Sequence, residues 1–320
     1  MNTKDSNHTL GYISIFLCCL TSAVSFVFIS HLNKTHDQMI SIALTFSYAA
    51  ILFNLCNLKK IISLYSSVAK NFKLLFRMNV MTLLNWVSSF MALNYLDPAT
   101  AFCIILSVVS ITLFIIFTPL NKIKDNKHLV FSILLIMISM ALIIKQSVDT
   151  TLLTDTKVIM FGVAWCVLGG ITGGLIGTSS EGMGKAGFSI TQILATRFYL
   201  LIIVSAIAFF IIPHTTPVVI DWKYYLLSSL VIVIFPLVMY QTAIKSLGSL
   251  VVSLLEPFTP VITYLLQISV GDYKFNIFTI ILLLISSGAV IWFVRIEQKI
   301  AREKRLLGVK GEVGNIQYEI

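Results

Sequence analysis

Ten apolar runs, separated by short polar segments, dominate the chain. They occupy residues 11–30, 38–58, 76–94, 98–119, 128–145, 157–180, 189–212, 222–244, 249–270 and 275–294. A run of about 20 apolar residues is long enough to cross a bilayer as a helix, and a helix satisfies its own backbone hydrogen bonds in lipid. The pattern therefore predicts an all-α polytopic membrane protein with ten transmembrane helices.

Charge supports this class and predicts an orientation. Only 12% of the 320 residues are charged, against about 25% in a soluble domain. If the N-terminus is cytoplasmic, 17 of the 23 Lys and Arg residues lie in inside segments and five in outside loops. The positive-inside rule then predicts both termini in the cytoplasm, across the inner (cytoplasmic) membrane. The net charge of +9 reflects this asymmetry, and no nucleic-acid partner is expected.

The two halves of the chain resemble each other. A shift of 151 residues places Ala92 on Ala243 and the fourth run on the ninth. Because each half holds five spans, an odd number, the second half must enter the membrane inverted relative to the first. Inverted repeats are typical of secondary transporters, which bind substrate near the midplane where the repeats meet. The predicted boundaries are residues 1–146 for the first repeat, 147–156 for a linker, 157–296 for the second repeat and 297–320 for a cytoplasmic tail.

Two ionisable residues lie well inside the predicted spans: Arg197 in the seventh and Glu256 in the ninth. A buried charge costs at least about 2.5–3.5 kcal/mol, so each should pair, face water or lose its charge. One hypothesis makes Glu256 a protonation (coupling) site or a site for a substrate amine, with Arg197 as its partner or as a clamp for a substrate carboxylate. The alternative is an interhelical ion pair with a purely structural role.

Uncharged polar and aromatic residues in mid-membrane positions are further candidates for substrate binding. They are Asn85, Trp86 and Ser89 in the third span, Trp165 in the sixth, and Tyr240 and Gln241 in the eighth. Together they would line a cavity of mixed aromatic and amide character. Burial of the tryptophans in helix packing is an equally good explanation.

Prolines and glycines predict irregular or closely packed helices. Pro236, Pro257 and Pro260 remove backbone donors and free carbonyl groups one turn earlier. Such kinks either adjust packing or expose binding groups beside a cavity. Gly169 and Gly173 belong to two GxxxG lines in the sixth span, which favour close helix packing or, alternatively, a hinge.

Other chemistry is not indicated. The five cysteines show no metal-ligand spacing, and the five histidines lie in loops or at span ends. No Ser/His/Asp set and no P-loop is present, so neither an enzyme, a metal site, a cofactor nor ATP-driven transport is expected. The basic stretch at residues 59–77 either lies on anionic lipid as an interfacial helix or simply obeys the inside rule.

Several motifs resemble the drug/metabolite transporter superfamily, specifically its EamA-type ten-helix members. They are ALNYLDPATA at residues 92–101, AIKSLGSLVVSLLEPFTPVITYLL from Ala243, the Gly271-Asp272 pair, and Arg197-Phe198. The first half departs from the pattern, with Thr45 in place of an arginine, Asn121 in place of the closing acid and Leu106 in place of a proline.

The resemblance implies a carrier of small metabolites with a central cavity. Sugar nucleotides and phosphates would need several cavity cations, whereas only Arg197 is available. The expected substrate is therefore a small polar or zwitterionic metabolite such as an amino acid or related amine, and the resemblance favours export. The expected partners are this metabolite, membrane lipid and protons as coupling ion, in a monomer or homodimer. The alternatives are a polytopic membrane enzyme acting on lipids and a non-transporting membrane subunit or receptor.

Overall fold

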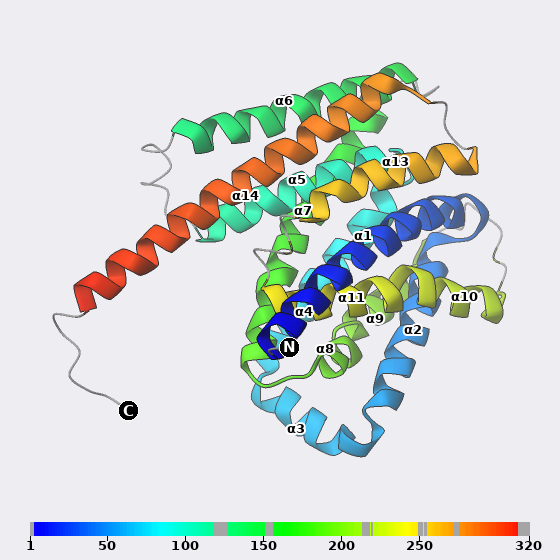
Figure 1. Cartoon of the computed structure of the whole chain (residues 1–320). Helices are drawn as coiled ribbons and strands as arrows, with labels where there is room; N and C mark the ends of the chain where they lie inside the picture. Colours follow the sequence, from blue (N-terminus) through cyan, green and yellow to red (C-terminus); the bar gives the residue numbers. More distant parts are fainter. Residues whose placement is uncertain are drawn as a thin grey trace.

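The computed structural model describes residues 3–117, 127–150, 156–212, 218, 220–248, 252, 255–271 and 275–312. Helices make up these ranges, with no strand among them (Figure 1). The first part of the chain forms α1 (Thr3–Thr35), α2 (Gln38–Cys56), η1 (Leu58–Lys60), α3 (Ile61–Lys70), α4 (Phe72–Ala92), α5 (Pro98–Phe117) and α6 (Lys127–Thr150). The second part forms α7 (Thr156–Lys185), α8 (Ile190–Thr196), α9 (Tyr199–Ile211), α10 (Trp222–Ser228), η3 (Ser229–Ile234), α11 (Phe235–Leu247), η4 (Glu256–Phe258), α13 (Thr259–Val270) and α14 (Ile277–Glu312).

Five stretches of helix are long and apolar enough to cross a membrane: Thr9–Thr35, Gln38–Cys56, Thr156–Lys185, Ile190–Ile211 and Trp222–Leu247. Three shorter apolar helices accompany them, at Pro98–Leu113, Val130–Gln146 and Ile277–Phe293. The all-α class is thereby confirmed for the described residues, and their apolar helices are those of a membrane protein. The count of ten spans stays a prediction.

Helix packing brings the two parts of the chain together rather than leaving them as separate bodies. α4 and α5 both pack on α7, α1 packs on α11 and α13, α2 packs on α8 and α9, and α5 packs on α13. α6 and α14 lie against each other at one edge of the molecule (Figure 1). The largest apolar core joins both parts: the Phe46 ring contacts Trp86 at 4.8 Å and Phe198 at 5.3 Å between ring centroids.

A glycine sets the distance between α5 and α7. A Cβ atom on Gly170 would lie 2.5 Å from Cβ of Val108 and 2.8 Å from the carbonyl oxygen of Ile105. Real Cβ atoms essentially never come this close, so no larger residue fits without moving the helices apart. The small residues that the sequence places in this span therefore allow the two backbones to approach closely.

The second part of the chain contains three helix interruptions. α8 ends at Thr196 and α9 begins at Tyr199, with Arg197 and Phe198 between them; η3 is a π-helical segment; and η4 is a 3-10 turn that precedes α13. Pro236 follows the π segment, and Pro257 lies within the 3-10 turn. α2, α4 and α5 each run without interruption.

Side chains from other helices satisfy the backbone groups that these interruptions release. The Asn79 amide donates to the carbonyl of Thr196 at 2.9 Å and accepts from the backbone N–H of Leu200 at 3.3 Å. The Ser25 hydroxyl lies 2.7 Å from the carbonyl of Val231, in the π segment, and can donate to it. The Ser287 hydroxyl donates to the carbonyl of Pro257. These four backbone groups therefore have side-chain partners, as irregular backbone in an apolar environment requires.

The helices extend into both segments that were predicted to lie outside the repeats. α6 continues to Thr150, inside the predicted linker at 147–156, and α14 continues to Glu312, inside the predicted tail at 297–320. Residues 151–155 of the linker and 313–320 of the tail lie outside the described residues.

Candidate functional site

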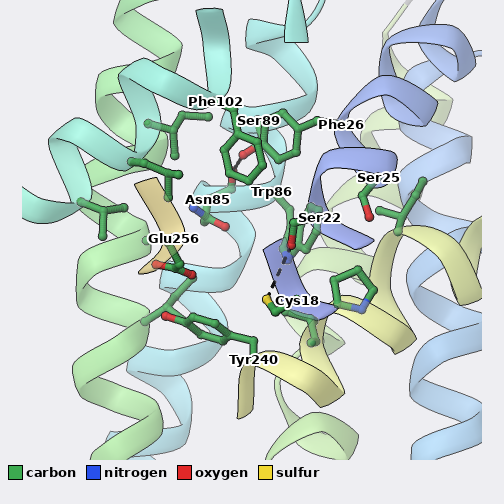
Figure 2. Close-up of a pocket in the computed structure, with 18 of the residues that line it drawn as sticks. Cys18, Ser22, Ser25, Phe26, Asn85, Trp86, Ser89, Phe102, Tyr240 and Glu256 are labelled. Atoms are coloured by element: carbon green, nitrogen blue, oxygen red, sulfur yellow. Dashed lines mark hydrogen bonds between the residues drawn. The ribbon is translucent and has the colours of Figure 1, made fainter. Parts of the chain in front are cut away.

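A cavity of about 140 Å³ lies between α1, α4, α5, α7 and α11. Six residues predicted for a substrate site line it: Asn85, Trp86, Ser89, Arg197, Tyr240 and Glu256. Figure 2 shows five of them, with Glu256 and Tyr240 on one side and Asn85, Trp86 and Ser89 on the facing helix. Residues far apart in the sequence therefore meet in one small space.

Positions related by the shift of 151 residues occur together in the cavity wall. Six such pairs line it: Ser22 with Gly173, Ser25 with Ile176, Asn85 with Pro236, Trp86 with Leu237, Ser89 with Tyr240, and Ile105 with Glu256. The shift was defined on the sequence, and the lining residues are those of the cavity in the structure. Both parts of the chain contribute corresponding positions to the same cavity.

Arg197 is a buried cation, and two of its three guanidinium nitrogen atoms have no hydrogen-bond partner among the described residues. Its side chain is 2% exposed, and neither Nε nor Nη1 makes a hydrogen bond. The centroid of the Phe198 ring lies 5.5 Å from the guanidinium carbon. Buried polar groups are nearly always hydrogen-bonded, so these nitrogen atoms are donors with unused hydrogen-bonding capacity.

Glu256 occupies the first position of η4 and is partly exposed. Among the described residues, Glu256 has no hydrogen-bond partner and forms no ion pair with Arg197; the ion pair found there is the surface pair Lys185–Glu181. The structural alternative, in which Arg197 and Glu256 neutralise each other, therefore does not describe this conformation. A carboxyl group and a guanidinium group are both available to a molecule in the cavity.

Uncharged side chains give the cavity one more hydrogen-bond donor and close it at two ends. The Trp86 indole N–H is buried without a partner. At one end of the cavity the rings of Phe26 and Phe102 stack with centroids 3.9 Å apart and planes within 3°. In Figure 2, Tyr240 lies at the opposite end. The polar groups are therefore enclosed between aromatic side chains, which is typical of small-molecule sites.

Trp165 and Gln241 do not line this cavity. Gln241 donates to the Ser180 hydroxyl at 3.0 Å and lines a second pocket, of about 370 Å³, between α7, α8 and α11. Trp165 packs edge-on against Phe161, with ring centroids 5.8 Å apart. A role of either residue in binding stays a prediction.

The predicted kink and hinge residues take different places. Pro236 and Gly173 line the cavity, and Pro257 and Pro260 are buried at the start of α13. Gly169 is buried on α7, and its backbone carbonyl accepts a hydrogen bond from the Asn85 side chain at 2.8 Å. The helices are irregular at Pro236 and Pro257, whereas hinge motion stays a prediction.

Sequence reasoning missed the contribution of the first helix. Cys18, Ser22 and Ser25 line the cavity from α1. Their spacing of four and then three residues places them on one helical face, a polar stripe in an apolar run that the sequence displays. Phe26 and Phe102 carried no comparable signal, because isolated phenylalanines are common throughout the chain.

The described ranges contain no group of three or more His, Cys, Asp or Glu residues that could hold a metal ion.

Comparison with known proteins identifies the fold and no family. No family model matches the chain, and no curated protein matches it. Among 23 matching chains of solved structures is one described only as "Crystal structure of protein", with a TM-score of 0.61 and 16% identity. The match covers 93% of this chain and 97% of the other. At this identity the likeness extends to the fold over nearly the whole of both chains, and not to an activity.

Proposed function

We propose that the protein is a secondary transporter that carries a small zwitterionic metabolite, such as an amino acid or related amine, by alternating access. The observation that carries the proposal is that Arg197, on one interrupted helix, and Glu256, on another, both line the cavity and form no ion pair with each other. Two opposite charges that are held apart in an apolar environment match a ligand that brings one charge of each sign.

The chemistry of the cavity assigns an end of the ligand to each group. A guanidinium with two free N–H positions binds a carboxylate through paired, charge-assisted hydrogen bonds, and the Trp86 indole offers a further donor. Glu256 accepts hydrogen bonds from an ammonium group. A volume of about 140 Å³ and a single cation favour a compact ligand over a sugar nucleotide.

Helix pairing supports two inverted repeats of five spans. If the order α1, α2, α4, α5, α6 corresponds to α7, α8–α9, α10–α11, α13, α14, the contact of α4 with α7 corresponds to that of α11 with α1. In the same way, the contact of α5 with α7 corresponds to that of α13 with α1. Three further contacts, α6–α14, α2–α9 and α5–α13, each join a helix to its own equivalent in the other repeat. The six paired cavity positions follow the same relation. We therefore place the substrate site at the junction of the repeats.

Orientation and direction complete the proposal. The charge distribution favours both termini in the cytoplasm and the inner membrane as the location. Export is proposed from the resemblance to EamA-type transporters. Proton coupling is assigned to Glu256, because a carboxyl group in an apolar cavity can exchange a proton for a substrate ammonium group.

The decisive test uses matched ligands on the purified full-length protein. We expect an amino acid to raise the midpoint of thermal unfolding, whereas its carboxamide and its N-acetyl derivative each raise it far less. At a ligand concentration 100 times Kd the stabilisation should be about 2.7 kcal/mol. Flux of the same amino acid into proteoliposomes, with and without a proton gradient, then separates transport from binding.

The competing functions predict other results. Stabilisation without flux in either direction would favour a receptor or non-transporting subunit. Chemical change of lipids incubated with the protein would favour a membrane enzyme. Equal stabilisation by the amino acid and both derivatives would refute the two-charge site.

A further inference from the structure

The short helix α3 carries both apolar and basic residues on a surface remote from the central cavity. In Figure 1 it crosses the lower end of the molecule, below α2. Leu64 is 1% exposed and packs inward, whereas Ile62 is 85% exposed. An amphipathic helix of this kind, with bare apolar side chains at one end of a helical membrane protein, is typical of the membrane interface.

A groove runs from α3 along α2 and α9. We call it the α2–α3 groove; its volume is about 490 Å³, and its apolar wall includes Ile51, Leu55, Leu58, Ile61 and Ile202. Ile51 and Leu55 are each more than half exposed. Along α2 the groove covers Ser47 to Leu55, a rise of about 12 Å at 1.5 Å per residue. It therefore has the elongated, apolar form that suits a hydrocarbon chain.

Hydrogen bonds fix α3 against this groove. The Tyr65 and Tyr199 hydroxyls lie 2.6 Å apart, and the Asn54 amide donates to Tyr199 at 3.0 Å and to the carbonyl of Ala195 at 3.1 Å. These contacts join α2, α3 and the start of α9. The groove is thus a fixed part of the fold rather than a gap that α3 would fill by moving.

A basic depression adjoins the groove and shares Leu58 and Ile61 with it. Its wall includes Lys59, Lys60 and the hydroxyl-bearing Ser63 and Ser66. Neither lysine forms an ion pair with a described residue. No acidic residue occurs in the sequence between Asp37 and Asp97, so nothing acidic nearby in the chain neutralises them.

We propose that the α2–α3 groove and this depression together bind one anionic phospholipid. An acyl chain lies in the groove, and the phosphate lies at Lys59 and Lys60, with the Ser63 and Ser66 hydroxyls within the same depression. The continuity of an apolar groove with an unneutralised basic pocket matches the two ends of this ligand. The site shares no residue with the central cavity and does not depend on transport.

Native mass spectrometry of the full-length protein tests the proposal. The protein is reconstituted with equal amounts of phosphatidylglycerol and phosphatidylcholine and then released in mild detergent. We expect one phosphatidylglycerol to be retained in preference to phosphatidylcholine. The double substitution Lys59→Gln/Lys60→Gln should reduce this retention about tenfold. Equal retention of the two lipids by the wild type would overturn the site.

Two further variants distinguish a site from general surface attraction. Lys70→Gln/Lys73→Gln removes the same charge from the same basic stretch outside the depression, and it should keep the lipid. Ile51→Trp blocks the groove without changing charge and should lose it. Loss in the lysine control, or retention by Ile51→Trp, would contradict a defined site.

Two controls remove the remaining ambiguities. The midpoint of thermal unfolding checks that each variant is folded; if Lys59→Gln/Lys60→Gln is not, Ile51→Trp alone decides. Inorganic phosphate added at millimolar concentration should not displace the lipid. Displacement by phosphate alone would assign the depression to a free anion and overturn the acyl-chain part of the site.

Discussion

The helices of the first half are continuous where those of the second half are interrupted. α2, α4 and α5 run unbroken, whereas the second half is interrupted at Arg197–Phe198, at the π segment Ser229–Ile234 and at Glu256–Phe258. Each interruption contributes a residue to the cavity wall: Arg197, Ile232 and Glu256. The two halves therefore differ in helix regularity, and all three interruptions of the second half lie in the wall of the cavity.

The continuous half also supports the interrupted one. Asn79 on α4 binds both sides of the break at Arg197–Phe198, and Ser25 on α1 lies beside the carbonyl of Val231. Released backbone groups would be costly in apolar surroundings without such partners. The third such donor, Ser287 on α14, lies in the second half itself. Both halves therefore supply hydrogen bonds to the irregular backbone, and two of the three donors come from the continuous half.

The largest effect on substrate affinity is expected from substituting Glu256, which the shift of 151 residues relates to Ile105 in the first half. Glu256→Gln keeps the side-chain shape but removes the charge that would bind an ammonium group. A charge-assisted hydrogen bond contributes about 1.5–3 kcal/mol, so substrate affinity should fall about 10- to 100-fold. Binding titrations and proteoliposome flux measure this change.

Ile105→Gln is the matched control for that experiment, because Ile105 lines the same cavity at the equivalent position. It should leave the affinity within a few-fold of the wild type. Comparable losses in both variants would mean that the cavity responds to volume and polarity rather than to the carboxylate of the second half.

Arg197→Met should separate binding from stability. An unpartnered intramembrane cation costs at least about 2.5–3.5 kcal/mol on insertion scales, so removing it should raise the thermal unfolding midpoint of the ligand-free protein. The same variant should lose the stabilisation by ligand carboxylate. A structural ion pair predicts the reverse, because breaking one costs about 3–5 kcal/mol. A lowered midpoint would therefore restore the structural alternative.

A smaller effect is expected at a pair of equivalent packing positions, Gly170 on α7 and Cys19 on α1. Gly170 faces the unbroken α5, where a Cβ would lie 2.8 Å from the carbonyl oxygen of Ile105. Cys19 faces the interrupted counterpart, where its thiol reaches the carbonyl of Leu255 at 3.6 Å. Gly170→Ala should destabilise the protein by about 1–3 kcal/mol, and Cys19→Ala by much less. Equal shifts in unfolding midpoint for the two variants would show that the helix interruption near Leu255 does not leave more space around Cys19 than the unbroken α5 leaves around Gly170.

The smallest effect is expected from Ser25→Ala. It removes a hydroxyl that is positioned to donate to the Val231 carbonyl, and the loss of such a hydrogen bond costs about 1 kcal/mol. Ser22→Ala is the control, since the hydroxyl of Ser22 has only a long contact of 3.7 Å with the Cys18 sulfur. Thermal unfolding in detergent compares the two; a larger loss for Ser22→Ala would mean that Ser25 does not support the π segment.

The apolar runs of the sequence predicted the helical class, and polar or aromatic residues within these runs predicted six residues that line the cavity. Both predictions depend only on the residues within a single apolar run. Proline marked two of the three interruptions. The break at Arg197–Phe198 contains no proline and involves Asn79, more than 100 residues away, so no local signal could reveal it. Long-range hydrogen bonds of this kind appear only when the fold is assembled.

The positions of Gln241 and Trp165 outside the central cavity have physical explanations. Gln241 follows Tyr240 directly, and successive helical residues point about 100° apart, so only one of the two faces the cavity. Trp165 precedes Gly173 by eight residues, which is about 12 Å along α7 and removes it from the site. The sequence indicates how far along a helix the cavity lies, but it does not indicate which face of the helix points into the cavity.

The last residue of α2, Cys56, is a native site for thiol labelling. All five cysteines are described, and Cys56 is the exposed one, while the other four are buried. A membrane-impermeant maleimide should therefore react at a single position of the unmodified protein. With both termini in the cytoplasm, this thiol should be labelled in inside-out vesicles and protected in intact cells. The native Cys56 thiol thus reports the orientation of the chain in the membrane, without any engineered tag.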